Sequence, residues 1–190
     1  MNIGGGTDMI SIIIVGIILL LLIIWTISTY NKFVTLRERV DNGKAQIAAQ
    51  IESRWDAVKS LINATKKYAK YESEVLESVI EQRTSISSNS TVKEMEHDDT
   101  QLNHVMGRLL AVSENYPELK ASDVYERTME SINQYEENVR RARMIYNDVV
   151  TKFNRQLKMF PSNMLASVFN FTARDYFEAT ESKQGIPSWD

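Results

Sequence analysis

An uncharged apolar run near the N-terminus, residues 10–27, most constrains what this chain can fold into. Only Ser11 and Thr26 add polar side chains to it. As a helix the run rises about 27 Å, close to the roughly 30 Å thickness of a bilayer's hydrocarbon core. A cleaved signal peptide is the alternative, but no Lys or Arg precedes the run, its apolar part is too long, and no small-residue cleavage site follows. We therefore assign residues 10–29 to one transmembrane helix.

The basic residues beside this run predict its orientation. Lys32, Arg37 and Arg39 follow it within about fifteen residues, whereas residues 1–9 contain no Lys or Arg. Positive flanking residues remain on the cytoplasmic side of a membrane. We expect residues 1–9 to form a short external tail and the C-terminal side to be cytoplasmic.

Composition limits what the remaining residues, about 160 of them, can do. They suffice for one soluble domain. The chain has no Cys, which excludes disulfides, thiolate metal sites and cysteine nucleophiles. Its formal net charge of −3 makes nucleic acid an improbable partner.

The spacing of apolar residues predicts an all-α fold. One helix should run from the membrane through residue 30 to about residue 87, because Gly43 is the only breaker there. Further helices are expected at 91–114, where Thr91 and Glu94 form a capping box, at about 122–160, and at 163–169 with Ser162 as its cap. We predict an elongated antiparallel bundle of three long helices and one short, occupying residues 30–171, and a polar tail at 172–190.

An apolar stripe on the membrane-proximal half of the first helix needs a cover. Length counting indicates that the helix at 91–114 returns only part of the way to the membrane. One hypothesis buries the stripe between protomers of a homo-oligomer; the alternative is that the loop at 115–121 lets the following helix slide down and cover it. This membrane-proximal stripe consists of Phe33, Leu36, Val40, Ile47, Ile51 and Trp55.

Few polar residues stand out as candidates for chemistry. Glu72 occupies a heptad core position, where it could pair with Arg141 or Arg143, and Asn147 is similar. We interpret all four as polar contacts that fix helix register. His97 and His104 could be imagined as metal ligands, but solvated surface residues are the simpler interpretation. No Gly-rich phosphate loop or nucleophile arrangement is present, so we predict no catalytic residues, no cofactor and no metal.

Several segments resemble one known family. They are YNKFVTLRERVD from Tyr30, RWDAVKSLINATKKYAKYE from Arg54, ENYPELKAS from Glu114 and ENVRRARMIYNDVVTKFNRQLKMFPSN from Glu137, followed by FNF and YFEA. Together they are similar to the LemA family of bacterial membrane proteins, in the family's order. Departures are Lys59, where relatives commonly have proline, Lys67, where they have glycine, and Tyr71, where they have histidine. The first two favour a straighter first helix, and the third weakens a catalytic role for the pair it forms with Glu72.

The resemblance implies a bacterial single-pass membrane protein with a cytoplasmic helical domain and no established activity or cofactor. Members include a magnetosome membrane protein, and genes of the family often lie beside one for a membrane zinc metalloprotease. We hypothesise a non-enzymatic scaffold that self-associates to organise the membrane. The alternative is an adaptor or regulator of a membrane-bound protease or another membrane complex.

Overall fold

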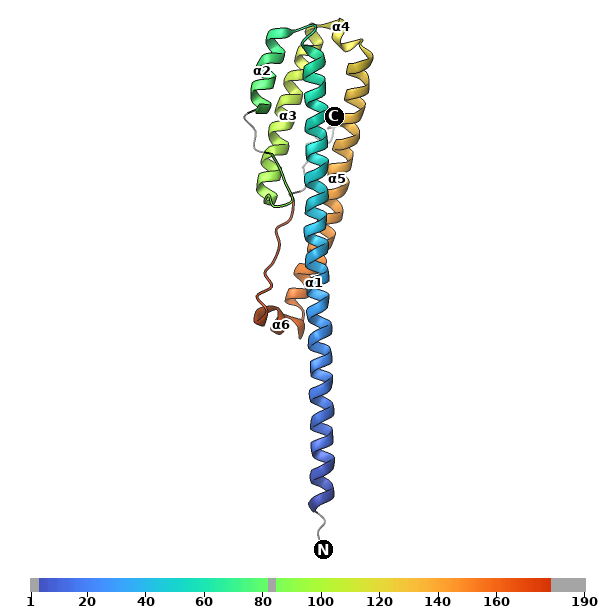
Figure 1. Ribbon diagram of the computed structural model, residues 1–190, viewed down its shortest axis with the longest axis vertical. Helices are drawn as coiled ribbons and strands as arrows, with labels where there is room; N and C mark the ends of the chain where they lie inside the picture. Colours follow the sequence, from blue (N-terminus) through green and yellow to red (C-terminus); the bar gives the residue numbers. More distant parts are fainter. Residues whose placement is uncertain (1–3, 82–84, 179–190) are drawn as a thin grey trace, which may run out of the picture. The chain divides into compact units, whose positions relative to one another are not determined.

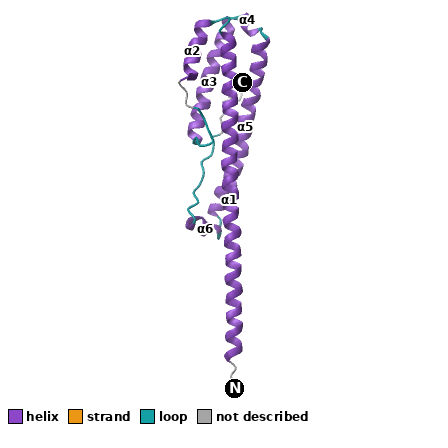
Figure 2. Cartoon of the chain, in the orientation of Figure 1, coloured by secondary structure: helices purple, strands orange, loops and turns teal. Residues whose placement is uncertain are grey.

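The computed structural model describes residues 4–81 and 85–178, and every regular element in these ranges is a helix (Figure 2). The all-α prediction is confirmed. The described residues form two compact units, one of residues 4–40 and 149–174, the other of residues 41–148 and 175–178. The helices labelled in Figure 1 are α1 (Gly4–Thr65), α2 (Lys70–Glu81), α3 (Val92–Asn115), α4 (Pro117–Lys120), α5 (Asp123–Lys158) and α6 (Ser162–Val168).

Helix α1 carries the apolar run. Its most apolar 18-residue window has a mean hydropathy of 3.2 and is not buried, and no other described helix is long and apolar enough to cross a membrane. The helix has 62 residues, so it is about 93 Å long. It already begins at Gly4, so residues 4–9 of the expected external tail are helical, while residues 1–3 lie outside the described ranges. The side of the membrane on which they lie stays a prediction.

The predicted helix from residue 30 to residue 87 is wrong beyond Thr65. The amides of Tyr68 and Ala69 both donate to the Thr65 carbonyl, each at 2.9 Å, and close a turn. Helix α2 then contacts α3, and the two lie side by side in Figure 1. Ala69 and Leu76 are buried three residues before and four residues after Glu72, which is the spacing that an unbroken heptad pattern would also give. The apolar spacing thus continues in phase across the turn, so the sequence pattern does not reveal the turn. The expectation that Lys67 favours a straighter first helix is wrong.

The starts of the next two long helices are confirmed. The Thr91 hydroxyl accepts from the Glu94 amide at 3.2 Å, and the Glu94 carboxylate accepts from the Thr91 amide at 2.6 Å. This capping box satisfies two amides that the first turn of α3 would leave unpaired. Pro117 opens the short α4, and α5 begins at Asp123 as predicted.

Helix α6 ends in a Schellman motif. The Phe171 amide donates to the Ala166 carbonyl at 2.9 Å and the Asn170 amide to the Ser167 carbonyl at 3.3 Å. Asn170 takes the left-handed conformation with φ 55°, which asparagine tolerates better than most residues. Ser162 is not the predicted cap: its hydroxyl donates to the carbonyls of Gln156 and Met159.

The first part of the predicted polar tail is held by the fold. Residues 171–178, named here the C-terminal segment, run without regular secondary structure and bury Phe177 to 2% exposure. A polar tail would leave this ring in water, at a cost of about 2 kcal/mol. The rest of the predicted tail, residues 179–190, lies outside the described ranges.

Candidate functional site

The membrane-proximal stripe is buried by the chain itself. Phe33, Val40, Ile47, Ile51 and Trp55 are at most 2% exposed, and Leu36 is half-buried. These side chains are thus covered within the chain, as the alternative expected, and association between protomers stays a prediction. The reason is length, because α5 has 36 residues and α3 has 24. The extra turns bring Phe153 edge-on against Phe33, with ring centroids 6.4 Å apart.

A buried polar contact lies at the far end of the stripe. The Trp55 indole Nε1 donates to Asp98 Oδ2 at 2.6 Å, and Asp98 is 3% exposed. Both partners are buried, and the low dielectric of the interior strengthens such a bond. Trp55 therefore fixes the position of α3 against α1 through this bond as well as through its apolar area.

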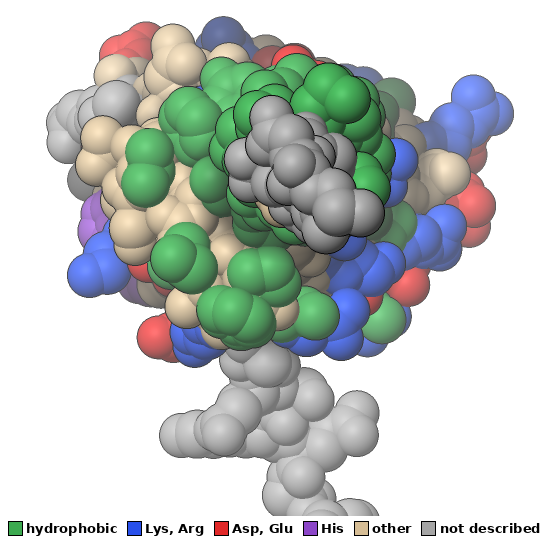
Figure 3. All heavy atoms as spheres, turned by 90° about the horizontal axis from the view of Figure 1, so that it is seen from below, with side chains coloured by type: hydrophobic (Ala, Val, Ile, Leu, Met, Phe, Trp, Pro, Cys, Tyr) green, Lys and Arg blue, Asp and Glu red, His purple; other side chains and the backbone are tan. Residues whose placement is uncertain are grey.

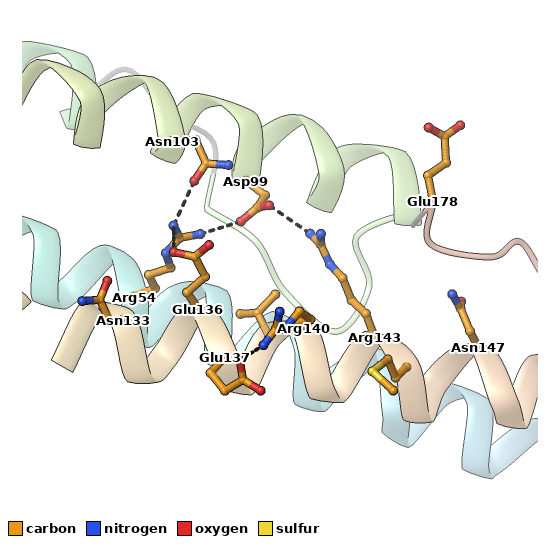
Figure 4. Close-up of a pocket in the computed structure, with 12 residues that line it drawn as sticks. Arg54, Asp99, Asn103, Asn133, Glu136, Glu137, Arg140, Arg143, Asn147 and Glu178 are labelled. Atoms are coloured by element: carbon orange, nitrogen blue, oxygen red, sulfur yellow. Dashed lines mark hydrogen bonds and ion pairs between the residues drawn. The ribbon is translucent and has the colours of Figure 1, made fainter. Parts of the chain in front are cut away.

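Arg54 is the centre of a larger network. Its guanidinium is 4% exposed; Nη1 donates to Asp99 Oδ1 at 2.9 Å, and Nη2 to Asn103 Oδ1 at 2.9 Å and to Glu136 Oε2 at 3.2 Å (Figure 4). A guanidinium can satisfy several acceptors at once in this way. Glu136 is 62% exposed, so its ion pair with Arg54 is screened and contributes less than the Asp99 contact.

Asp99 joins Arg54 to a second arginine. Arg143 Nη2 lies 3.3 Å from Asp99 Oδ2 (Figure 4). The Arg143 guanidinium also lies over the Phe177 ring, 5.2 Å from its centroid. Among the described residues, neither the buried Nε of Arg54 nor that of Arg143 has a hydrogen-bond partner. Each Nε is a donor that a bound oxygen atom could satisfy.

These residues border an open cavity of about 590 Å³, named here the arginine cleft. Three arginines and four carboxylates line it, so its charges are nearly balanced. Such a surface suits a polar protein segment that presents oxygen acceptors and some apolar area. The lining residues are Arg54, Asp99, Asn103, Asn133, Glu136, Glu137, Val139, Arg140, Arg143, Met144, Asn147 and Glu178.

Two of the four residues expected to fix helix register lie at one site, and the other two lie elsewhere. Arg143 and Asn147 both line the arginine cleft. Glu72 contacts neither arginine in the ion pairs found and instead accepts from the Tyr116 hydroxyl at 3.2 Å. Arg141 is 66% exposed and pairs with Glu137 at 3.9 Å, one turn earlier on α5. The proposed pairing of Glu72 with an arginine is thus replaced by a contact to the start of α4.

The Tyr116 contact changes the acidity of the phenol. The hydrogen bond to Glu72, and then the negative charge of that carboxylate, raise the pKa of Tyr116 above its ordinary value of 10.0. Both effects favour the protonated hydroxyl, which is the form that can donate. The contact is therefore kept throughout the neutral range.

Two asparagines on α5 hold the C-terminal segment by its backbone. Asn147 Nδ2 donates to the Phe177 carbonyl at 2.9 Å, and its Oδ1 accepts from the Phe177 amide at 3.0 Å. Asn154 makes the same pair of bonds with Arg174, both at 2.9 Å. The Tyr146 hydroxyl adds a bond to the Asp175 carbonyl at 3.0 Å. Each asparagine side chain thus satisfies a backbone amide and a backbone carbonyl that would pair with a neighbouring strand in a sheet.

Sequence reasoning missed Arg54, Asp99 and Asn154. Nothing in the sequence around Arg54 or Asp99 marks either residue as part of an ion-pair network. Asn154 did have a signal, because it follows Asn147 by seven residues and so occupies the same helix face.

The two histidines lie on the surface. His97 and His104 are exposed, and the His97 ring lies 3.0 Å from the Gln101 amide. Within residues 4–81 and 85–178, no three His, Asp or Glu side chains are placed so that they could hold a metal ion together.

Comparisons with known proteins give one family. The family model described as "LemA family" matches residues 43–189. The chain is 23% identical to Magnetosome protein MamQ 2 of Paramagnetospirillum magneticum, over 78% of this chain and 64% of that protein. It is 24% identical to Protein LemA of Metamycoplasma hominis, over 80% of this chain and 69% of that protein. The chain thus spans somewhat less than two thirds of the magnetosome relative's length.

Proposed function

The chain belongs to the LemA family, and from this premise we propose that it is a non-enzymatic adaptor that organises other proteins at a bacterial cell membrane. In this proposal α1 is the single membrane span, with the helical domain on the cytoplasmic side. The arginine cleft is the surface that binds a second membrane protein. A membrane metalloprotease is one candidate partner, which the family resemblance implies.

The burial of the membrane-proximal stripe is the observation that carries this proposal. Self-association was inferred because the stripe had no cover, and α5 now provides that cover. The argument for a self-associating scaffold therefore loses its basis. A surface that can receive a different protein remains, because the arginine cleft is open and two buried Nε donors beside it have no acceptor among the described residues.

Apolar exposure beside the arginine cleft supports the same proposal. Met144 lines the cleft and is 69% exposed, and the neighbouring Ile145 is 53% exposed. Methionine adapts to irregular partner surfaces, and arginine is enriched in protein interfaces. The relatives named as magnetosome proteins are consistent with work at a membrane, and none of the reported names states an enzymatic activity.

Site-specific photocrosslinking tests the proposal. A benzophenone amino acid at Met144 should form an adduct with a different membrane protein in native membranes, and Arg140→Glu should reduce that adduct severalfold. The matched control places the same crosslinker at Val124, an apolar residue of α5 that is 54% exposed and lies outside the cleft.

The mass of the purified particle completes the test. Light scattering, net of detergent, should give the monomer mass of 21.8 kDa. A discrete multiple of that mass, with Met144 adducts made of two copies of this chain, would restore the self-associating scaffold. Equal crosslinking from Met144 and Val124 would reject the arginine cleft as the binding surface.

A further inference from the structure

Helix α6 and the residues beside it turn large apolar side chains outward. Phe160, Met164 and Val168 follow one another at intervals of four residues and are 80%, 61% and 70% exposed. On the opposite side, the small residues Ser162 and Ala166 are each 4% exposed. A helix that only had to pack on its own domain would bury the large side chains and expose the small ones. The outward apolar face therefore fits an apolar environment outside the protein.

Ring contacts place this face at the end of the membrane span. The Phe169 ring meets Tyr30 edge-on, with centroids 4.9 Å apart, and Phe171 stacks on Phe33 at 4.9 Å. Tyr30 is three residues beyond Ile27, the last residue of the apolar run, and so about 4.5 Å further along the helix axis. Tyrosine is typical of the membrane–water interface. Phe169, the residue directly after α6, thus contacts an α1 residue expected at headgroup level.

The view along the anchor agrees with this position. Figure 3 looks at the molecule from below relative to Figure 1 and shows hydrophobic side chains gathered on the face beside the anchor helix, with Lys and Arg side chains along part of the margin. Met159 and Phe169, which flank α6, add exposures of 49% and 43%. The face beside the anchor is therefore apolar, as the membrane span is.

The charge of this unit differs from that of the rest of the chain. Residues 149–174 contain four Lys or Arg and no Asp or Glu, and residues 28–40 contain three Lys or Arg and one Glu. The whole chain nevertheless carries a formal net charge of −3. Basic side chains close to a bilayer are attracted to anionic headgroups. Positive charge is thus concentrated in the unit that holds the membrane end of the domain.

We propose that residues 159–169 form a second membrane contact, which inserts Phe160, Met164 and Val168 into the headgroup region of an anionic leaflet beside the span. The basic residues of the same unit pair with lipid phosphates. The fold holds α6 in place before it meets lipid, so this seven-residue helix need not fold on the membrane, as free interfacial peptides do. This proposal requires the anchor but does not depend on the adaptor function.

Depth-dependent quenching in nanodiscs tests the membrane contact. The chain has no Cys, so Met164→Cys and Met144→Cys each accept a single environment-sensitive fluorophore. Both methionines are strongly exposed, and Met144 belongs to the other unit, which makes it the matched control. In nanodiscs containing phosphatidylglycerol, we expect lipids spin-labelled near the headgroup to quench the Met164 label at least threefold more than the Met144 label.

Two results would overturn the proposal. Equal quenching at Met164 and Met144 would show that the apolar face does not meet lipid and is free for a protein partner. Equal Met164 quenching in phosphatidylglycerol and in pure phosphatidylcholine would remove the role given to the basic residues. The measurement uses purified full-length protein without a partner, so its failure is distinct from failure of the adaptor proposal. Circular dichroism of each labelled variant confirms that the helices are intact.

Discussion

Replacing Asn154 by leucine should release the C-terminal segment from α5. Asn154 is 8% exposed and makes two hydrogen bonds of 2.9 Å with the Arg174 backbone. Leucine has a similar size but neither a donor nor an acceptor. A neutral hydrogen bond contributes about 0.5–1.5 kcal/mol net, so the two bonds together contribute about 1–3 kcal/mol. This difference corresponds to about 5- to 150-fold in the opening equilibrium of the segment.

Amide hydrogen exchange at Arg174 measures this opening directly. In Asn154→Leu the Arg174 amide should exchange about 5- to 150-fold faster than in the original chain. Asn154→Asp keeps the acceptor for that amide but loses the donor to the Arg174 carbonyl, so it should have a smaller effect. Asn133→Leu, an exposed position on the same helix, is the control and should leave the Arg174 rate unchanged. A rate in Asn154→Leu within twofold of the original would refute the assigned role of the amide.

Further substitutions test three other contacts. Ile47→Ala should lower the free energy of unfolding, measured in urea, by about 2–5 kcal/mol without changing the particle mass, because Ile47 is fully buried within the chain. A lower particle mass with unchanged stability would instead show that the stripe lies between protomers. Glu72→Gln should lower the pKa of Tyr116 toward 10.0 in an ultraviolet titration, with Tyr116→Phe identifying the transition. Because the folded-state pKa is raised, the stabilisation by this contact is complete below pH 10.0 and is lost as pH rises through the folded-state value. Thr91→Ala should cost about 1 kcal/mol at neutral pH. The Thr91 backbone and hydroxyl bonds lower the pKa of Glu94 below 4.5, so that contribution is present above pH 4.5 and is lost as pH falls through the folded-state value. Because the Thr91 amide that donates to this carboxylate is kept in Thr91→Ala, the pH dependence is tested with Glu94→Ala: its difference in stability from the original chain should shrink in acid, and an unchanged difference would argue against the capping box.

The starts of helices were predictable because they are local. At Thr91 and Glu94, two side chains satisfy amides within three residues, and the sequence displays that pattern directly. The end of α1 at Thr65 was not predictable in this way. The turn after it contains neither Gly nor Pro, and Ala69 and Leu76 keep the heptad phase of the helix before it. A periodic pattern shows which helix face is apolar. It cannot distinguish one straight helix from two helices joined by a turn that keeps the same spacing.

The cover of an apolar face was equally hidden. The sequence predicted that Phe33, Val40 and Ile47 need burial, and they are buried, but whether α5 or a second chain covers them depends on how far α5 extends. Arg54 was missed because its partners come from α3 and α5, more than forty residues away in the chain. Such a convergence leaves no mark in the neighbouring sequence.

The contact between Phe33 and Phe153 also determines how long an apolar helix face stays uncovered during translation. Phe33 leaves the ribosome early, whereas Phe153 and Phe171, the rings that cover it, follow about 120 and 140 residues later. At about 5–20 residues per second, the Phe33 ring waits roughly 6–24 s for its first partner. During that interval the nascent chain is already tethered to the bilayer with an apolar helix face uncovered. A translation product that stops before residue 149 would keep that face exposed and prone to aggregate.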